Sequence, residues 1–212
     1  MAKVTGALLS LGGSGAVAKT VVYSKWRGVP YARQFVKPSN PNTADQQQTR
    51  SVFTFMSNLW KLAATAAQLP WASNAVGRAY TGRNKFIGDN VRLLRPGTDM
   101  SDFVASPGSN GGLVAASISA ANVAGTVTTT LVAPDLPSGW TIQSATAWLV
   151  HNSDPHTATV FQSYVGTDNT TPYAPAVSGV AVGSYIVSGW FVFVKPDGSL
   201  AYGPSISTTV TV

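Results

Sequence analysis

The sequence predicts an α+β chain that is mainly β, with its helices confined to the N-terminal half. Apolar residues recur at helical spacing between residues 43 and 94, whereas runs rich in Val, Thr, Tyr and Trp, separated by Gly and Pro, occupy much of the remainder. Glu is absent from all 212 residues, which limits helix formation in the C-terminal half. Only 10% of the residues are charged, against roughly 25% in an average globular protein, so Ser, Thr, Asn, Gln and Gly must supply most of the surface.

The N-terminal region predicts a glycine-rich arm followed by a β-hairpin. Residues 16–26 and 29–36 are rich in Val and aromatic residues, and the short turn Arg27-Gly28 separates them. Residues 37–42, Lys-Pro-Ser-Asn-Pro-Asn, then predict an extended linker, because each proline restricts its own backbone and that of the residue before it.

Two helices are expected after the linker. Thr43 and Gln46 have the spacing of a capping box, and the helix they begin extends over residues 43–69 to the stop at Leu69-Pro70. Its expected apolar face consists of Val52, Phe53, Met56, Leu59, Trp60 and Ala63. A weaker pattern predicts a second helix over residues 82–94, with Thr81 as its cap.

The C-terminal half predicts an all-β immunoglobulin-like or fibronectin-type sandwich. Residues 99–112 are rich in Ser, Gly, Pro and Asn, which places a boundary there between a region at 1–100 and a sandwich at 110–212. Trp148 and Trp190 are its expected core aromatics. The expected strands are 113–119, 126–132, 141–151, 157–165, 177–182, 185–194 and 205–212.

The two regions differ in charge. Residues 1–100 hold 13 Lys and Arg against three Asp, a net charge of +10, whereas residues 101–212 hold one Lys against five Asp, a net charge of −4. This asymmetry predicts two different roles, with the basic region anchoring the chain to a partner.

Known catalytic and metal-binding patterns are missing from the sequence. The absence of Cys excludes disulfides, zinc–thiolate sites and a cysteine nucleophile. His151, Asp154 and His156 are the best candidate metal ligands, but no fourth ligand is evident, and a solvated turn is the preferred interpretation. The glycine-rich residues 11–15 lack the Gly-Lys-Ser/Thr ending of a phosphate loop, and no serine elbow or carboxylate pair occurs. We therefore expect no enzyme activity, no cofactor and no metal.

Aromatic and basic residues interleave along the expected hairpin. Such a pattern suits nucleic acid, through phosphate contacts and base stacking, or a protein interface, and the protein interface is favoured because Arg and aromatic residues are enriched there. The residues expected to anchor the partner are Tyr23, Trp26, Arg27, Tyr31, Arg33 and Arg50. Neither a signal peptide nor a membrane-spanning segment is expected.

The order of these features resembles a family of structural proteins encoded by tailed bacteriophages and related mobile elements. The resemblance rests on the hairpin 21–33, the linker 37–43, Gln48-x-Arg50-x-x-Phe53 and the Asn-x-Phe-Ile segment 84–87, with a C-terminal pattern at 190–193 and 197–205. It implies a virion structural protein without catalytic residues, made in the host cytoplasm. Its implied partners are other virion proteins, such as the major capsid protein or tail and connector subunits, and copies of itself.

Within that interpretation, a capsid accessory or decoration protein is favoured over a tail or head-tail connector component. Two other classes stay open. One is a carbohydrate-binding or adhesion module, with Trp140, Tyr164 and Tyr173 as stacking surfaces for a glycan. The other is a nucleic-acid-binding protein that uses the basic region.

Overall fold

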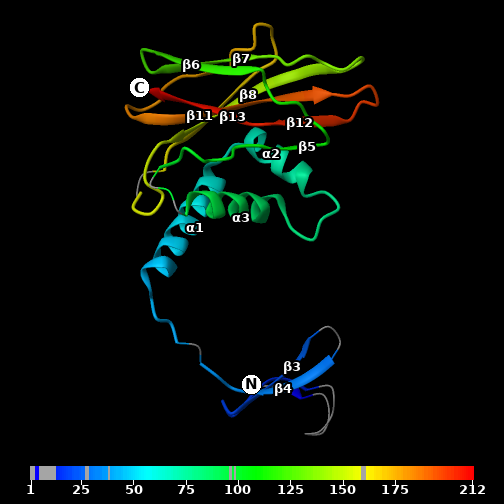
Figure 1. Cartoon of the computed structure of the whole chain (residues 1–212), viewed down its shortest axis with the longest axis vertical. Helices are drawn as coiled ribbons and strands as arrows, with labels where there is room; N and C mark the ends of the chain where they lie inside the picture. Colours follow the sequence, from blue (N-terminus) through cyan, green and yellow to red (C-terminus); the bar gives the residue numbers. More distant parts are fainter. Residues whose placement is uncertain are drawn as a thin grey trace. The chain divides into compact units, whose positions relative to one another are not determined.

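The computed structural model describes residues 3–4, 13–26, 29–37, 39–95, 97, 99–158 and 161–212, and its fold is α+β and mainly β (Figure 1). Its contacts divide the chain into two compact units, residues 1–42 and residues 43–212. Among the described residues, no helix is both long enough and apolar enough to span a membrane.

The first unit is an antiparallel sheet in the order β1-β2-β3-β4. Its strands are β1 (Lys3–Val4), β2 (Gly13–Val17), β3 (Val21–Trp26) and β4 (Val29–Gln34). The expected hairpin is confirmed in the pairing of β3 with β4, which runs from Val21 opposite Gln34 to Trp26 opposite Val29. The turn at Arg27-Gly28 lies outside the described residues.

The expected first strand of the hairpin, residues 16–26, is interrupted by a reverse turn. Ala18 and Lys19 have φ values of 47° and 55°, and the amide of Thr20 donates to the carbonyl of Val17 at 2.9 Å. The chain therefore folds back, and β2 pairs with β3. An Ala-Lys turn with two positive φ angles contains none of the Gly, Asn or Asp residues that normally mark such turns, so no residue pattern predicts it.

In the second unit, the expected helix 43–69 is two helices, α1 (Ala44–Leu62) and α2 (Thr65–Asn74), because Ala63 and Ala64 are extended. The hydroxyl of Thr43 accepts from the amide of Gln46, as the capping pattern predicted. The stop expected at Leu69-Pro70 is wrong, since Pro70 lies inside α2. The neighbouring Trp71 is fully buried, and its indole Nε1 donates to the carbonyl of Ala105 at 2.7 Å, so tertiary packing holds α2 in place.

The apolar face of α1 is rotated slightly from the expected one. Val52, Met56 and Leu59 are buried as predicted, but Phe53 is 52% exposed and Phe55 occupies the core instead. The ring of Phe55 lies 5.3 Å from that of Phe161. Helix α3 (Gly82–Leu94) has the predicted bounds, and Thr81 caps it by accepting from the amide of Asn84 at 3.2 Å.

Two antiparallel sheets follow the helices. The smaller has the order β10-β7-β6, and the larger has the order β5-β12-β11-β8-β9, with β13 also paired to β11. Their strands are β5 (Pro107–Ser109), β6 (Ser117–Val123), β7 (Thr126–Val132), β8 (Thr141–His151), β9 (Ser163–Asp168), β10 (Ala176–Val177), β11 (Ser184–Val194), β12 (Leu200–Pro204) and β13 (Ile206–Thr211). The sequence predicted β7 and β8 with these bounds and missed β5 and β12, which are short and contain Gly and Pro.

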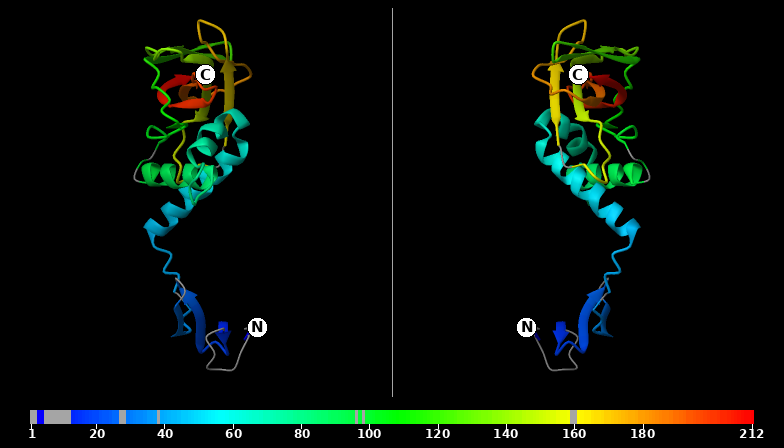
Figure 2. Two further views of the ribbon diagram at one scale, coloured as in Figure 1. Left: turned by 90° about the vertical axis from the view of Figure 1, so that its right-hand side faces the viewer. Right: turned by 90° about the vertical axis from the view of Figure 1, so that its left-hand side faces the viewer.

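The helices and the two sheets form three layers, with the larger sheet in the middle (Figures 1 and 2). One face of that sheet contributes Trp148 and Trp190, both fully buried as predicted, to a core that it shares with the helices. The opposite face packs against the smaller sheet through residues such as Leu149 and Phe191.

This shared core explains why the boundary expected at residues 99–112 is not where the contacts divide the chain. Met100, Phe103 and Ala105 are buried between the helices and the larger sheet. The polar residues around these three core residues led to the prediction of a boundary there. The helices and the sheets instead belong to the same unit.

Separating the helices from the sheets should therefore destroy cooperative folding. In a fragment of residues 101–212, Trp148 and Trp190 would lose their helical cover, so we expect a broad unfolding transition and binding of a hydrophobic dye. A fragment of residues 43–212 should unfold in one sharp transition in urea, followed by tryptophan fluorescence. A sharp transition in the shorter fragment would contradict the shared core.

Asn90 joins α3 to the segment before β5 and provides a second test. Its fully buried side chain donates to the carbonyls of Phe86 and Val104 and accepts from the amide of Val104. Asn90→Ala would leave buried backbone groups unpaired, so we expect the free energy of unfolding to fall by about 2–4 kcal/mol in urea titrations. Asn84→Ala, on the exposed side of the same helix, is the control and should change it by less than about 0.5 kcal/mol.

Candidate attachment surface

The register of the first sheet decides which expected anchoring residues lie together. Tyr31 and Arg33 are two positions apart on β4 and lie on the same face, because side chains alternate along a strand. Tyr23 is opposite Ala32 and therefore lies on the other face. Tyr31 and Arg33 are both exposed, whereas Tyr23 is partly buried.

The other three expected residues are Trp26, Arg27 and Arg50. The backbone of Trp26 pairs with Val29, but its side chain and all of Arg27 lie outside what the structure describes. Arg50 is an exposed residue of α1 and belongs to the second unit. Among the described side chains of the first sheet, Tyr31 and Arg33 on β4 are the expected pair that shares a face.

The described part of the first sheet shows no buried face. None of the side chains that the structure describes between residues 15 and 42 is buried, and Val36 is 68% exposed. A small sheet normally depends on one apolar face packed against another element, since its hydrogen bonds alone contribute little net stability. Within the described part of residues 1–42, no such covering layer is found.

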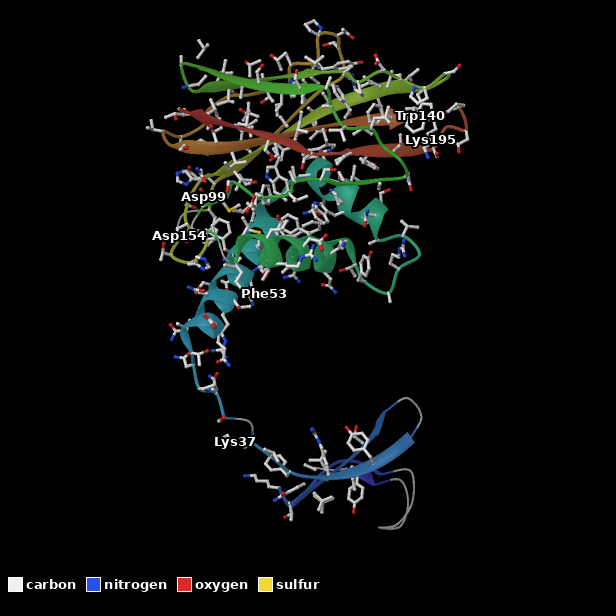
Figure 3. All side chains as sticks on the ribbon, viewed as in Figure 1. Lys37, Phe53, Asp99, Trp140, Asp154 and Lys195 are labelled. Atoms are coloured by element: carbon white, nitrogen blue, oxygen red, sulfur yellow. The ribbon has the colours of Figure 1, made fainter. Side chains whose placement is uncertain are left out.

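All of the net charge of the chain lies in this unit. Residues 1–42 contain six Lys and Arg and no acidic residue, whereas residues 43–212 contain eight Lys and Arg and eight Asp. The expected division into +10 and −4 thus becomes +6 and zero when the units of the structure replace the compositional boundary. Lys19, Arg33 and Lys37 are exposed among the described cations, and Figure 3 labels Lys37 just after β4.

Strand β4 is an edge of this sheet, and in the described part of the chain no strand pairs with its outer side. The amide of Phe35 donates to the carbonyl of Thr20 at 2.8 Å. Because backbone groups alternate along a strand, every second residue before Phe35 also directs its amide towards β3, and the residues between them direct theirs outward. By that alternation the amides of Ala32 and Gln34 point away from β3, while Pro30, the third outward residue, has no amide hydrogen. The outer side of β4 can therefore accept another strand over a short length.

The histidine-containing turn does not form a metal site in the described chain. Asp154 accepts from the amide of His156 at 2.9 Å and from the hydroxyl of Thr157 at 3.1 Å, so its carboxylate stabilises the turn. The Nε2 atom of His156 lies 2.8 Å from the carbonyl of Gly97, and the ring of His151 packs against another aromatic side chain. Within the described residues, no group of three or more His, Cys, Asp or Glu could hold a metal ion.

The three aromatic residues considered for glycan stacking lie in different places. The ammonium group of Lys195 lies 5.4 Å from the ring centre of Trp140. Figure 3 labels both residues at one end of the sheets. Tyr173 packs on Phe191 with ring centres 5.3 Å apart, whereas Tyr164 packs against a separate core cluster. Each is partly buried against the core, and they do not present one stacking platform.

A groove between α1 and α3 was not predicted from the sequence. Its volume is about 280 Å³, and Phe53 of α1 forms one wall, opposite Ile87 and Val91 of α3. Arg83 and Asn84 stand at its rim. The exposed Phe53, labelled in Figure 3, was the available sequence signal, but the helical spacing assigned it to the core.

Comparisons with known proteins identify no relative. No protein-family model matches the chain, and neither a curated protein nor a solved structure matches it significantly.

We expect hydrogen exchange in the intact chain to be faster in the sheet of the first unit than in the larger sheet of the second unit. Because no described side chain of the first unit is buried, we expect the amides of β2, β3 and β4 to exchange within seconds to minutes. The amides of β8 and β11, which lie in the middle layer between the helices and the smaller sheet, should be protected for hours. Mass spectrometry of peptic fragments would measure both, and equal protection of the two sets would show that the sheet is stable by itself.

Proposed function

We propose that this chain is a non-enzymatic structural protein of a tailed-bacteriophage particle, a capsid accessory or decoration protein that is anchored by residues 1–42 and displays residues 43–212. One observation carries the proposal: a unit with six cations and no acidic residue, none of whose described side chains is buried, accompanies a compact unit of zero net charge. The resemblance of the N-terminal sequence to phage structural proteins supports the same role.

The chemistry of the first unit favours a protein partner. A sheet that lacks a covering layer gains one when it binds, and its exposed Tyr31 and Arg33 are of the residue types enriched in protein interfaces. The free outer side of β4 can add a strand from a neighbouring subunit. Six cations without a single acidic residue suit an acidic protein surface.

We further propose that the two β layers of the displayed unit are an immunoglobulin-like sandwich. Two antiparallel sheets that pack face to face support this assignment, as does a fully buried tryptophan on the long strand β8. The helical layer over the outer face of the larger sheet would then be an addition to that sandwich.

Deletion of residues 1–42 tests the anchoring role. Purified residues 43–212 should stay folded, as judged by circular dichroism and cooperative unfolding, yet fail to co-sediment with particles that bind the full chain. If the truncated protein still co-sediments at full occupancy, the anchoring assignment is wrong. Density of the intact particle would then separate a capsid position from a tail or connector position.

Substitution of charges tests the electrostatic part of the proposal without a deletion. The triple variant Lys19→Gln, Arg33→Gln and Lys37→Gln should weaken co-sedimentation at least about tenfold at low salt. The control removes the same number of exposed cations from the second unit, through Lys61→Gln, Arg78→Gln and Arg92→Gln, and should bind like the unaltered chain. Equal losses in both variants would contradict a specific role for the first unit.

A DNA-binding measurement addresses the nucleic-acid alternative with the same variants. Affinity of the full chain for duplex DNA that falls steeply with salt and is lost in the first triple variant, without any particle binding, would replace the protein partner with a nucleic acid.

A further inference from the structure

A recess on the larger sheet, beside α2, is a second feature that the sequence patterns did not indicate. It has a volume of about 500 Å³, within the range of about 300–1,000 Å³ that small-molecule sites occupy. Residues of β8, β9, β11 and β12 form its floor, and Ala66 and Leu69 of α2 form an apolar wall. It is separate from the groove at Phe53, with which it shares no lining residue.

The polarity of β8 changes where the recess begins. Trp148 and Val150 lie on the helix-facing side and are buried in the core that the helices cover. Ser144 and Thr146 precede them at two-residue spacing on the same side, but they line the recess. The helix-facing side of β8 thus presents hydroxyl groups in the recess, although aliphatic residues there would add stability. Such a surface is suited to a polar ligand.

A β-bulge adds an amide group to this surface. The pairing of β11 with β8 joins Val192 to Ser144 and then Phe193 to Ile142, so Gln143 is the extra residue between them. Gln143 lines the recess together with its neighbour Ser144. Bulges commonly redirect a side chain next to a binding site.

The polar side chains of the recess are available for a ligand. Within the described residues, no hydrogen bond involves the side chains of Gln143, Ser144, Thr146, Thr167, Asn169 or Tyr202. Thr146 is only 2% exposed and Tyr202 only 5%. Polar groups in such positions normally have hydrogen-bond partners, so a ligand that offers donors and acceptors suits them.

The electrostatics of the lining disfavour an anionic ligand. Among the described residues, no Lys, Arg or His lines the recess, so no described cation would neutralise an anion there. The carboxylate of Asp168, which also lines the recess, is held in place because it accepts from the amides of Ala174 and Thr170 and from the hydroxyl of Thr170. These hydrogen bonds, first that of Ala174, lower the pKa of Asp168, whereas burial raises the pKa of Tyr202 and keeps its phenol a neutral donor.

We propose that this recess binds a neutral carbohydrate. Hydroxyl and amide groups on the strands match sugar hydroxyls, and the aliphatic side chains of Leu69, Val192 and Leu200 match the C–H faces of a sugar ring. This site is distinct from the stacking surface considered at Trp140, Tyr164 and Tyr173, and it does not depend on the anchoring role of residues 1–42.

Nuclear magnetic resonance titration of the full chain tests the proposal. The probes are lactose, maltotriose and N,N′-diacetylchitobiose, with sialyllactose as the anionic comparison, each added to millimolar concentration. We expect at least one neutral sugar to shift the backbone amides of residues 143–146, 167–169 and 200–202, and sialyllactose to shift them less. Absence of shifts in these residues with all three neutral sugars, or stronger shifts with sialyllactose, would overturn the proposal.

Variants separate binding in the recess from binding elsewhere. Tyr202→Phe removes one hydroxyl and leaves the buried ring, and Asn169→Ala removes one exposed amide; each should weaken binding about fivefold, the equivalent of one hydrogen bond. Tyr173→Phe removes a phenol hydroxyl outside the recess and should bind like the unaltered chain. Unchanged affinity in both recess variants, with their unfolding curves intact, would place the sugar elsewhere and refute the site.

Discussion

The fold of residues 43–212 depends on burying strand β11 on both faces. Nine consecutive residues of this strand, Tyr185 to Phe193, are buried, because the helices cover one face and the smaller sheet covers the other. Gly189 shows how close the smaller sheet lies: a Cβ atom there would come within 2.7 Å of the side chain of Leu131 on β7. A strand covered in this way reads as a continuous apolar run rather than an alternating one.

The sheet of the first unit differs from β11 in its burial. Its sheet has the strands and pairings of a small β domain, yet none of its described side chains is buried. The two units therefore differ in burial: a shared core stabilises residues 43–212, whereas the described part of residues 1–42 shows no such core, which is why we propose that a partner covers it. This contrast, rather than any single residue, is the physical basis for assigning attachment to residues 1–42.

Sequence reasoning succeeded where the signal was local. Helix α3, with its Thr81 cap, and strands β7 and β8 have the bounds that capping chemistry and side-chain periodicity predicted. It failed where the determining contacts are distant in sequence. Met100 and Phe103 lie in a stretch with loop-like composition, and only the helices and the larger sheet together reveal them as core residues.

The candidate sites show the same limit. Interleaved basic and aromatic residues predict the anchoring residues, but strand alternation places Tyr23 and Tyr31 on opposite faces of their sheet. The recess could not have been found in this way, because its lining comes from α2 and four strands that adjoin one another only in the folded chain. Gln143 in particular depends on a shift in pairing that has no distinct residue signature.

The uneven distribution of charge along the chain predicts that salt affects the two proposed sites differently. Residues 43–212 carry equal numbers of cations and Asp, and no cation lines the recess, so a ligand there is held by short-range hydrogen bonds and apolar contacts that salt scarcely screens. Residues 1–42 carry the full charge of +6, and their attraction to an acidic surface acts over about 10 Å and weakens as salt is added. If both proposals hold, ionic strength should weaken attachment and leave ligand binding in the recess unchanged, because the two reside in different units of the chain.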